Sequence, residues 1–208
     1  MSEAYIALLA FVVLMVATPG PANLVVMIGG SKQGVRACAG FILGLVSGKI
    51  LLNIVFGLGF GLVLTNLPHI VTVIKFGGAG YMIWLALRSW NDRPTNGHQR
   101  DTYRFGHGLM VHPLNPKAWV MVTLAWSQFA PALGGFGEFG GFGVQLALVT
   151  ATFAAVQLVF HTLWCAAGAV TSKALQGSLL LTRILISLTI LVVIWALSYD
   201  PSSSASPV

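Results

Sequence analysis

Six long apolar runs, separated by short polar segments, indicate that this 208-residue chain is built for a membrane. The runs cover residues 4–30, 38–65, 68–87, 113–132, 144–172 and 174–198. Each is close to the roughly 20 residues that a helix needs to cross a bilayer. Continuous runs favour helices over a transmembrane barrel, whose strands alternate polar and apolar residues. We therefore predict an all-α, polytopic membrane protein with six transmembrane helices in a single domain, residues 1–208.

The composition excludes the main soluble alternatives. Only 8% of the residues are charged and 56% are hydrophobic, whereas soluble domains carry about a quarter charged residues. The net charge of +6 could suggest nucleic acid, but the 11 Lys and Arg residues lie mostly in short connections, so we exclude a nucleic-acid partner. Cys38 and Cys165 lie in apolar runs and are expected to be buried and unpaired. Nothing indicates a cofactor. The N-terminal segment has Glu3 and no basic start, so we expect it to be retained rather than cleaved.

The basic residues alternate between connections and so predict the orientation. The connections after the first, third and fifth runs contain Lys32, Arg36, Arg88, Arg93, Arg100, Arg104 and Lys173, and the other connections have no Lys or Arg. Cytoplasmic loops carry the excess of Lys and Arg. We expect these three connections in the cytoplasm and both termini outside.

A polar segment, residues 91–103, divides the chain into two halves of three runs each. We predict repeat one over 4–90, a cytoplasmic linker over 91–103 and repeat two over 104–198, followed by a disordered tail over 199–208. Because three is odd, the second repeat must be inverted relative to the first.

Each half contains a helix breaker inside an apolar run. The first is Pro19-Gly20-Pro21, and the second is "HPLNPKAW" with Pro113 and Pro116. The short apolar piece "FGHGLMV" before the second break predicts a half-helix. Interrupted helices at corresponding positions of inverted repeats point to a transporter's substrate site, although a lone proline in a membrane helix usually makes only a kink.

A broken helix supplies polar groups where the bilayer has none. The amides from Ala22 onward would be free to bind an anionic group. The carbonyls near Val16 and Thr18 could receive an ammonium group, and Asn23 and Asn115 supply both donors and acceptors. A zwitterion such as an amino acid would satisfy both kinds of group.

Lys49 is the residue least expected at its position, near the middle of the second run. It should face the interior, be paired or lose its proton, because a lysine at the bilayer centre costs at least about 2.5 kcal/mol. Asn53 lies one turn away, and Gln157 and His161 repeat that spacing in the fifth run. No Asp or Glu lies within any run, so a proton carrier would have to be Lys49 or His161. Alternatively, His161 donates only to a carbonyl of a neighbouring helix.

Three stretches resemble the LysE/RhtB family of amino-acid exporters. These are "ATPGPANLVVMIGGSKQGVRACAGFILGLVSG", "IKFGGAGYMIWLALRSW" and "FGHGLMVHPLNPKAWVMVTLAWSQF", which occur in this order over about residues 4–90 and 103–130. The resemblance implies a secondary transporter in the bacterial cytoplasmic (inner) membrane. It would export amino acids or small derivatives from the cytoplasm, driven by the proton gradient. It carries over Pro19, Gly20, Pro21, Asn115, Pro116 and Lys117 as motif positions. Lys49 departs from the family pattern, in which the residue after Gly48 is often acidic or neutral.

Other interpretations remain open at this point. A channel would need rings of polar residues or a filter, and an intramembrane enzyme would need an evident nucleophile and base. His98, His107 and His112, taken as loop residues, fit no zinc-site spacing, so we expect no metal. Gly40, Gly44 and Gly48 should let helices approach closely, within one chain or between copies, so a second copy is a candidate partner beside lipid and substrate.

Overall fold

The computed structural model describes residues 2–59, 68–91, 103–133, 137–174 and 179–198, and every regular element among them is a helix. In chain order these are α1 (Ser2–Ala17), α2 (Pro21–Gly57), α4 (Pro68–Leu87), α5 (Phe105–Val111), α6 (Pro116–Leu124), the π-helix η1 (Ala125–Phe129), α7 (Ala130–Leu133), α8 (Gly137–Ala174) and α9 (Leu179–Ser198). The prediction of an all-α chain is confirmed for these residues. Two features predicted from sequence alone are also present: α4 spans 68–87, and the half-helix before the second break is α5.

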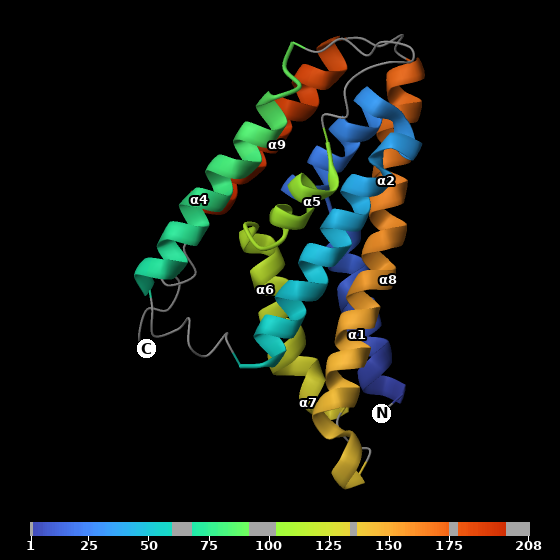
Figure 1. The fold of residues 1–208 in the computed structure, drawn as a ribbon, viewed down its shortest axis with the longest axis vertical. Helices are drawn as coiled ribbons and strands as arrows, with labels where there is room; N and C mark the ends of the chain where they lie inside the picture. The colour runs from blue at the N-terminus through green and yellow to red at the C-terminus, as the bar shows by residue number, and fades with distance from the viewer. Residues whose placement is uncertain (1, 60–67, 92–102, 134–136, 175–178, 199–208) are drawn as a thin grey trace, which may run out of the picture.

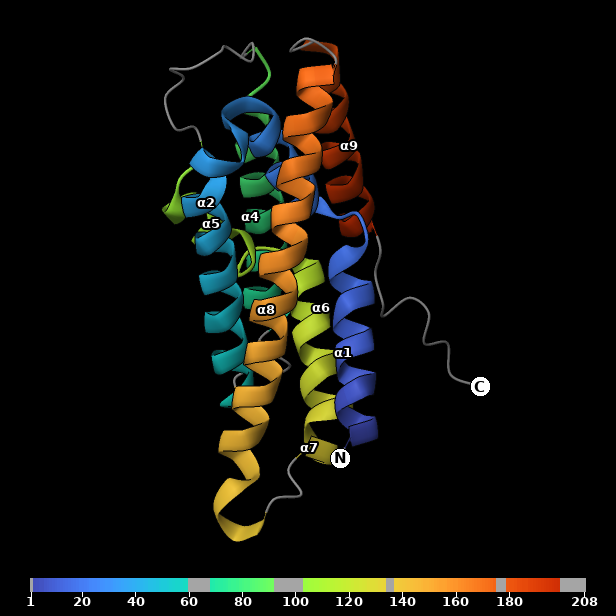
Figure 2. The same cartoon turned by 90° about the vertical axis from the view of Figure 1, so that its right-hand side faces the viewer.

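The 37 residues of α2 form two helical parts, because the chain turns back at Gly34. Gly34 has φ 75° and ψ 169°, a backbone conformation that residues with a Cβ rarely adopt. The first part continues the direction of α1, and the second part runs back beside α8 (Figures 1 and 2). The Pro-Gly-Pro break therefore lies within one pass of the chain, made by α1 and the first part of α2.

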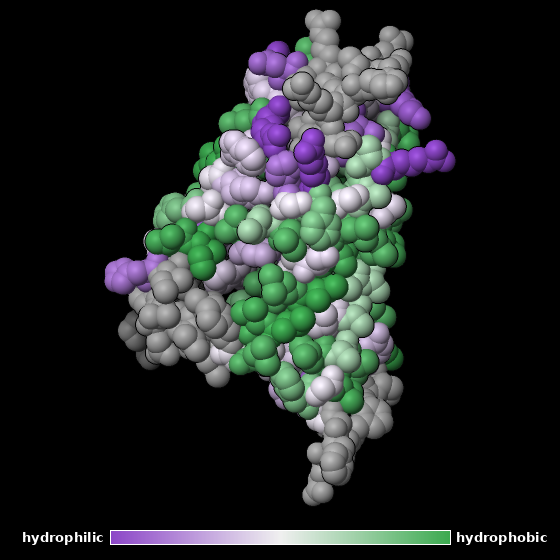
Figure 3. Space-filling view, viewed as in Figure 1, coloured by the Kyte–Doolittle hydropathy of each residue, from purple (hydrophilic) through white to green (hydrophobic). Residues whose placement is uncertain are grey.

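The remaining helices alternate in direction. The α4 helix runs toward the end of the molecule where α2 turns back, α5 and α6 return from that end, α8 runs toward it again and α9 returns (Figure 1). The helices α2 and α8 are long and apolar enough to cross a membrane, and α1, α4 and α9 contain shorter apolar helical segments. Polar side chains gather at the end where α2 turns back, and much of the face below is apolar (Figure 3). Such a surface is suited to lipid.

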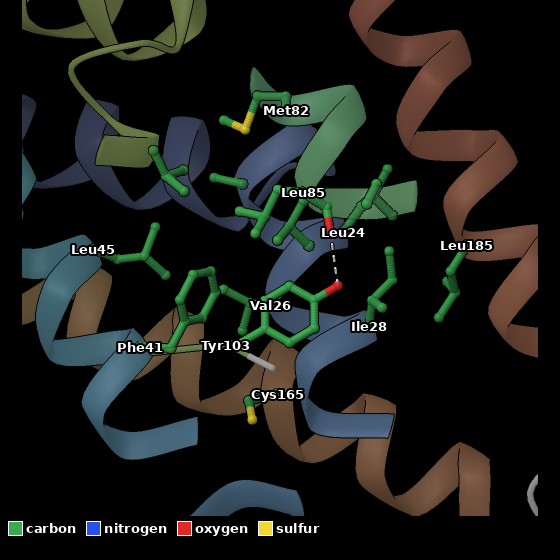
Figure 4. Packing of buried hydrophobic residues seen from close by; sticks show 14 of the residues in the cluster. Leu24, Val26, Ile28, Phe41, Leu45, Met82, Leu85, Tyr103, Cys165 and Leu185 are labelled. Atoms are coloured by element: carbon green, nitrogen blue, oxygen red, sulfur yellow. Dashed lines mark hydrogen bonds between the residues drawn. The ribbon is translucent and has the colours of Figure 1, made fainter. Parts of the chain in front are cut away.

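The two larger of three apolar clusters form most of the core of the described residues. One lies toward the polar end and centres on Tyr103, whose ring packs edge-on against Phe41 at 5.3 Å and whose hydroxyl donates to the Leu85 carbonyl at 3.2 Å (Figure 4). The other joins α1, α6, α7 and α8 and includes Leu8 and Phe153. Tyr103, which we placed at the end of the polar linker, is thus fully buried. The two clusters hold the helices around the breaks.

Candidate functional site

The first break separates α1 from α2 over Thr18, Pro19 and Gly20. Gly20 is extended, with φ −162° and ψ 172°, and Pro21 is the first residue of α2. Proline suits this position because the first amides of a helix have no partner within it. No side chain caps the start of α2. The positive end of this helix is therefore open to a ligand at the break.

Asn23 closes the other side of the first break. Its Nδ2 donates to the carbonyl oxygens of Val16 at 2.8 Å and Thr18 at 2.9 Å. We expected these carbonyls to be available for a substrate ammonium group. In this structure both carbonyls accept from the chain's own amide, and the Thr18 carbonyl also lies 3.3 Å from the Lys117 ammonium group. Their role toward a substrate remains a prediction.

The second break separates α5 from α6. Asn115 precedes Pro116, and its Oδ1 accepts a hydrogen bond from the Lys117 amide at 3.1 Å. The Trp119 Nε1 donates to the Pro113 carbonyl at 2.8 Å and fixes the loop. The start of α6 is thus capped by a side chain while the start of α2 is not. The two breaks are similar in sequence but differ in whether a side chain caps the helix that follows.

Lys117 connects the two breaks across the molecule. Its Nζ donates to the Thr18 hydroxyl at 2.8 Å and lies 3.3 Å from the Thr18 carbonyl oxygen. A Cβ on Gly20 would lie 3.3 Å from the same Nζ, so the ammonium group is next to the open start of α2. A cavity of about 360 Å³ adjoins this point. Its lining includes all six motif positions: Pro19, Gly20, Pro21, Asn115, Pro116 and Lys117.

Helices α4 and α9 complete the wall of this cavity. Ala79 and Met82 line it from α4, and Val193 and Trp195 line it from α9. The cavity is thus largely apolar, with its polar groups at the breaks. Ligand pockets for small molecules commonly combine an apolar wall with a few polar groups.

A buried polar cluster lies behind Lys117. The Nδ1 atom of His161 is 3.1 Å from Asn23 Oδ1, and its Nε2 is 3.3 Å from His112 Nε2. The two imidazole rings stack with centroids 5.5 Å apart. Gln157 lines a small cavity of about 20 Å³ with these three residues, and its Oε1 has no hydrogen-bond partner. The small cavity also touches Gly20, Asn115 and Lys117, so it adjoins the large one.

His112 was not predicted as a site residue. We took it for a loop residue, and it is the C-cap directly after α5, but its side chain is only 4% exposed. Its position directly before Pro113 was the available signal, since residues beside a helix break are held at the site. His107 is also helical, and His98 lies outside the described residues. The described part of the chain contains no group of three His, Cys, Asp or Glu residues that could bind a metal ion.

Lys49 is fully buried, which its position in the second run requires. Its Nζ donates to the Ala118 carbonyl at 3.2 Å and lies 4.3 Å from the centre of the Phe153 ring. Asn53 does not bind the ammonium group but donates to the Lys49 carbonyl at 3.0 Å. Neither residue lines the two cavities described above. Lys49 meets the site only through Ala118, which lines the small cavity.

An apolar helical bundle with broken helices around an internal polar site defines a membrane transport protein. The chain belongs to the LysE type translocator family, whose model matches residues 13–199. It is 26% identical over 165 residues to an uncharacterized membrane protein of Vibrio cholerae serotype O1, covering 76% of this chain and 78% of the relative.

Two further relatives have named substrates. The chain is 27% identical to a homoserine/homoserine lactone efflux protein of Salmonella typhi and 26% identical to that of Salmonella typhimurium, in each case over 122 residues. These alignments cover 56% of this chain and 59% of each relative. No solved structure matches the chain.

Proposed function

We propose that this translocator exports a small amino acid or amino-acid derivative of the homoserine type, with the proton gradient as its energy source. One observation carries the proposal: Lys117 of the second break reaches Thr18 of the first, beside the open start of α2 and a cavity of about 360 Å³. The efflux relatives support the direction of transport and the substrate class.

The anionic end of the substrate would bind at the first break. A carboxylate there would meet the uncapped amides of α2 and the Lys117 ammonium group from two sides. Hydrogen bonds to charged groups contribute about 1.5–3 kcal/mol each, more than neutral ones. The capped start of α6 offers no equivalent site.

The polar cluster would receive the donor groups of the substrate. The carbonyls of Val16 and Thr18 already accept from Asn23, so a further acceptor would help to bind these groups. Gln157 has an unpaired Oε1 at the small cavity. It is the acceptor best placed for a substrate ammonium or hydroxyl group. Lys49 and Asn53 line neither cavity, so they would not contact the substrate. The charge of Lys49 would instead change the electrostatic potential of the site from the other side of α6.

We also propose six spans in two inverted repeats, with the polar end of the molecule in the cytoplasm. Four exposed basic residues support this orientation, because they lie at or beside helix ends that face the polar end of the molecule (Figure 1). Arg36 follows the turn of α2 at Gly34, Arg88 follows α4, Arg104 precedes α5 and Lys173 lies in the last turn of α8.

Cysteine labelling in intact cells tests the orientation. Ala132→Cys, exposed in α7, should react with a membrane-impermeant maleimide. Ala37→Cys, exposed beside Arg36, should react only after permeabilisation. The native Cys38 and Cys165 are fully buried and should give little background in the parent protein. The reverse labelling pattern would refute the proposed orientation.

Counterflow in liposomes tests the function. Vesicles loaded with unlabelled homoserine should transiently concentrate labelled homoserine, and the initial rate should saturate with external substrate. Empty vesicles and vesicles without protein are the controls. A rate that rises linearly without saturation would indicate a channel, and chemical conversion of the label would indicate an enzyme. Absence of exchange across a panel of amino acids and lactones would refute the proposal.

A further inference from the structure

We propose that Nδ1 of His112 is the proton-binding atom of this transporter, poised by a hydrogen-bonded chain that runs from one broken helix to the other. The chain consists of the Val16 and Thr18 carbonyls, Asn23, His161 and His112. The inference rests on the proposed function, because a bound proton matters for transport only if the protein moves a substrate.

The orientation of Asn23 follows from its partners. Carbonyl oxygens can only accept, so the amide nitrogen of Asn23 must face Val16 and Thr18. The Oδ1 atom then faces His161 and can only accept. His161 must therefore carry a hydrogen on Nδ1.

The protonation of His161 in turn determines the hydrogen-bond roles of the two nitrogen atoms of His112. A neutral imidazole has one N–H and one acceptor nitrogen, so Nε2 of neutral His161 is an acceptor. The Nε2 of His112, 3.3 Å away, must donate to it. Neutral His112 therefore has its lone pair on Nδ1. That atom is buried and has no hydrogen-bond partner, in a side chain only 4% exposed.

A buried acceptor without a partner is unusual, and at a substrate site it calls for a functional explanation. A proton is a ligand that this lone pair can take up while the rest of the chain stays in place. It would add to the Nδ1 lone pair without breaking any bond, and the Nε2–H of His112 would go on donating to His161. The positive charge would lie on His112, and loss of the same proton from Nδ1 would restore the neutral chain.

The surrounding charges link this proton to the substrate. Lys117 lines the small cavity with His112, and Lys49 reaches Ala118 on its wall. The apolar runs contain no Asp or Glu to balance a third cation. A protonated His112 and a substrate ammonium group would repel each other, so they should occupy the site in turn. Alternate occupancy by proton and substrate is the requirement for exchange of one for the other.

His112→Gln tests the assignment. The Gln amide nitrogen can still donate to His161 Nε2, but the side chain cannot bind a proton at neutral pH. In liposomes with an acidic interior, the wild-type protein should accumulate homoserine up to about tenfold per pH unit if one proton exchanges for one substrate. The variant should reach only equal concentrations inside and outside, and this loss of accumulation should exceed any loss in its counterflow rate, which needs no net proton movement.

His107→Gln is the matched control. His107 also lies on α5, but it bonds to Arg104 and Arg88 and lines neither cavity. It should leave the accumulation unchanged. Accumulation by His112→Gln equal to wild type would overturn the assignment. Failure of wild-type counterflow would instead refute the proposed function, so the two failures are distinguishable.

A measurement on the unmodified protein covers the case in which the variant does not fold. Homoserine added to purified protein in weakly buffered detergent should release protons, detected with a pH indicator dye, when the starting pH leaves His112 protonated. Release that is absent across the pH range in which homoserine binds would overturn the assignment without any substitution.

Discussion

Lys117→Met should weaken homoserine binding about 10–100-fold, because a hydrogen bond to a charged group contributes about 1.5–3 kcal/mol. Methionine keeps the apolar length of the side chain but removes the ammonium group that lies 2.8 Å from the Thr18 hydroxyl. The open start of α2 would then bind the carboxylate alone. The concentration dependence of counterflow, or calorimetry on purified protein, gives the affinity.

Lys75→Met is the control for loss of a lysine from the membrane region. Lys75 lies in α4, which contributes to the cavity wall, but Lys75 itself lines neither cavity. Its substitution should leave the affinity unchanged. Equal affinity for homoserine in Lys117→Met and wild type would show that the Lys117 ammonium group does not bind the substrate.

The double substitution Pro19→Ala and Pro21→Ala should reduce transport about 100-fold. Alanine is about 3 kcal/mol more favourable than proline inside a helix, so α1 and α2 should join. The amides of Gly20 and Ala22 would then take the carbonyls of Val16 and Thr18, which Asn23 now binds. Loss of the open helix start removes at least two hydrogen bonds to a charged group, or about 3 kcal/mol of substrate binding.

Pro131→Ala provides a matched proline control, since Pro131 is exposed in α7 and away from both breaks. It should transport normally. The yield and monodispersity of both proteins in detergent separate loss of the site from loss of folding. A double variant that folds and transports at the wild-type rate would show that the Pro-Gly-Pro break is not needed for substrate binding.

Much of the fold could be predicted because the bilayer constrains sequence strongly. Apolar run length located α4, proline positions located both breaks, and the short piece before the second break located α5. The end of the second transmembrane segment was predicted less accurately. We placed it at residue 65, whereas α2 ends at Gly57 and residues 60–67 lie outside the described structure.

The partners within the site could not be predicted. Lys117 and Thr18 are 99 residues apart, and His161 and Asn23 are 138 residues apart, so only the packing of whole helices brings them together. Helical spacing paired Lys49 with Asn53, but spacing does not tell whether an amide binds the ammonium group or, as here, a backbone carbonyl. His112 was missed for a related reason: its neighbour across the site belongs to another helix.

Close contacts of helices at glycine residues affect how the helices can move apart. A Cβ on Gly44 or Gly108 would overlap the backbone of the facing helix, and the same holds for Gly30 and Gly168 between α2 and α8. At these glycines main chain thus touches main chain, with no side chain between the two helices that could rotate aside. Between α1 and η1, by contrast, the rings of Phe11 and Phe129 lie 5.2 Å apart and fill the space between the helices. We expect the contact between α1 and η1 to open by side-chain rotation, and the glycine contacts only by separating whole helices, a collective motion on the microsecond-to-millisecond scale. The step that separates the helices at the glycine contacts, rather than the step that opens the aromatic contact, would then limit the turnover.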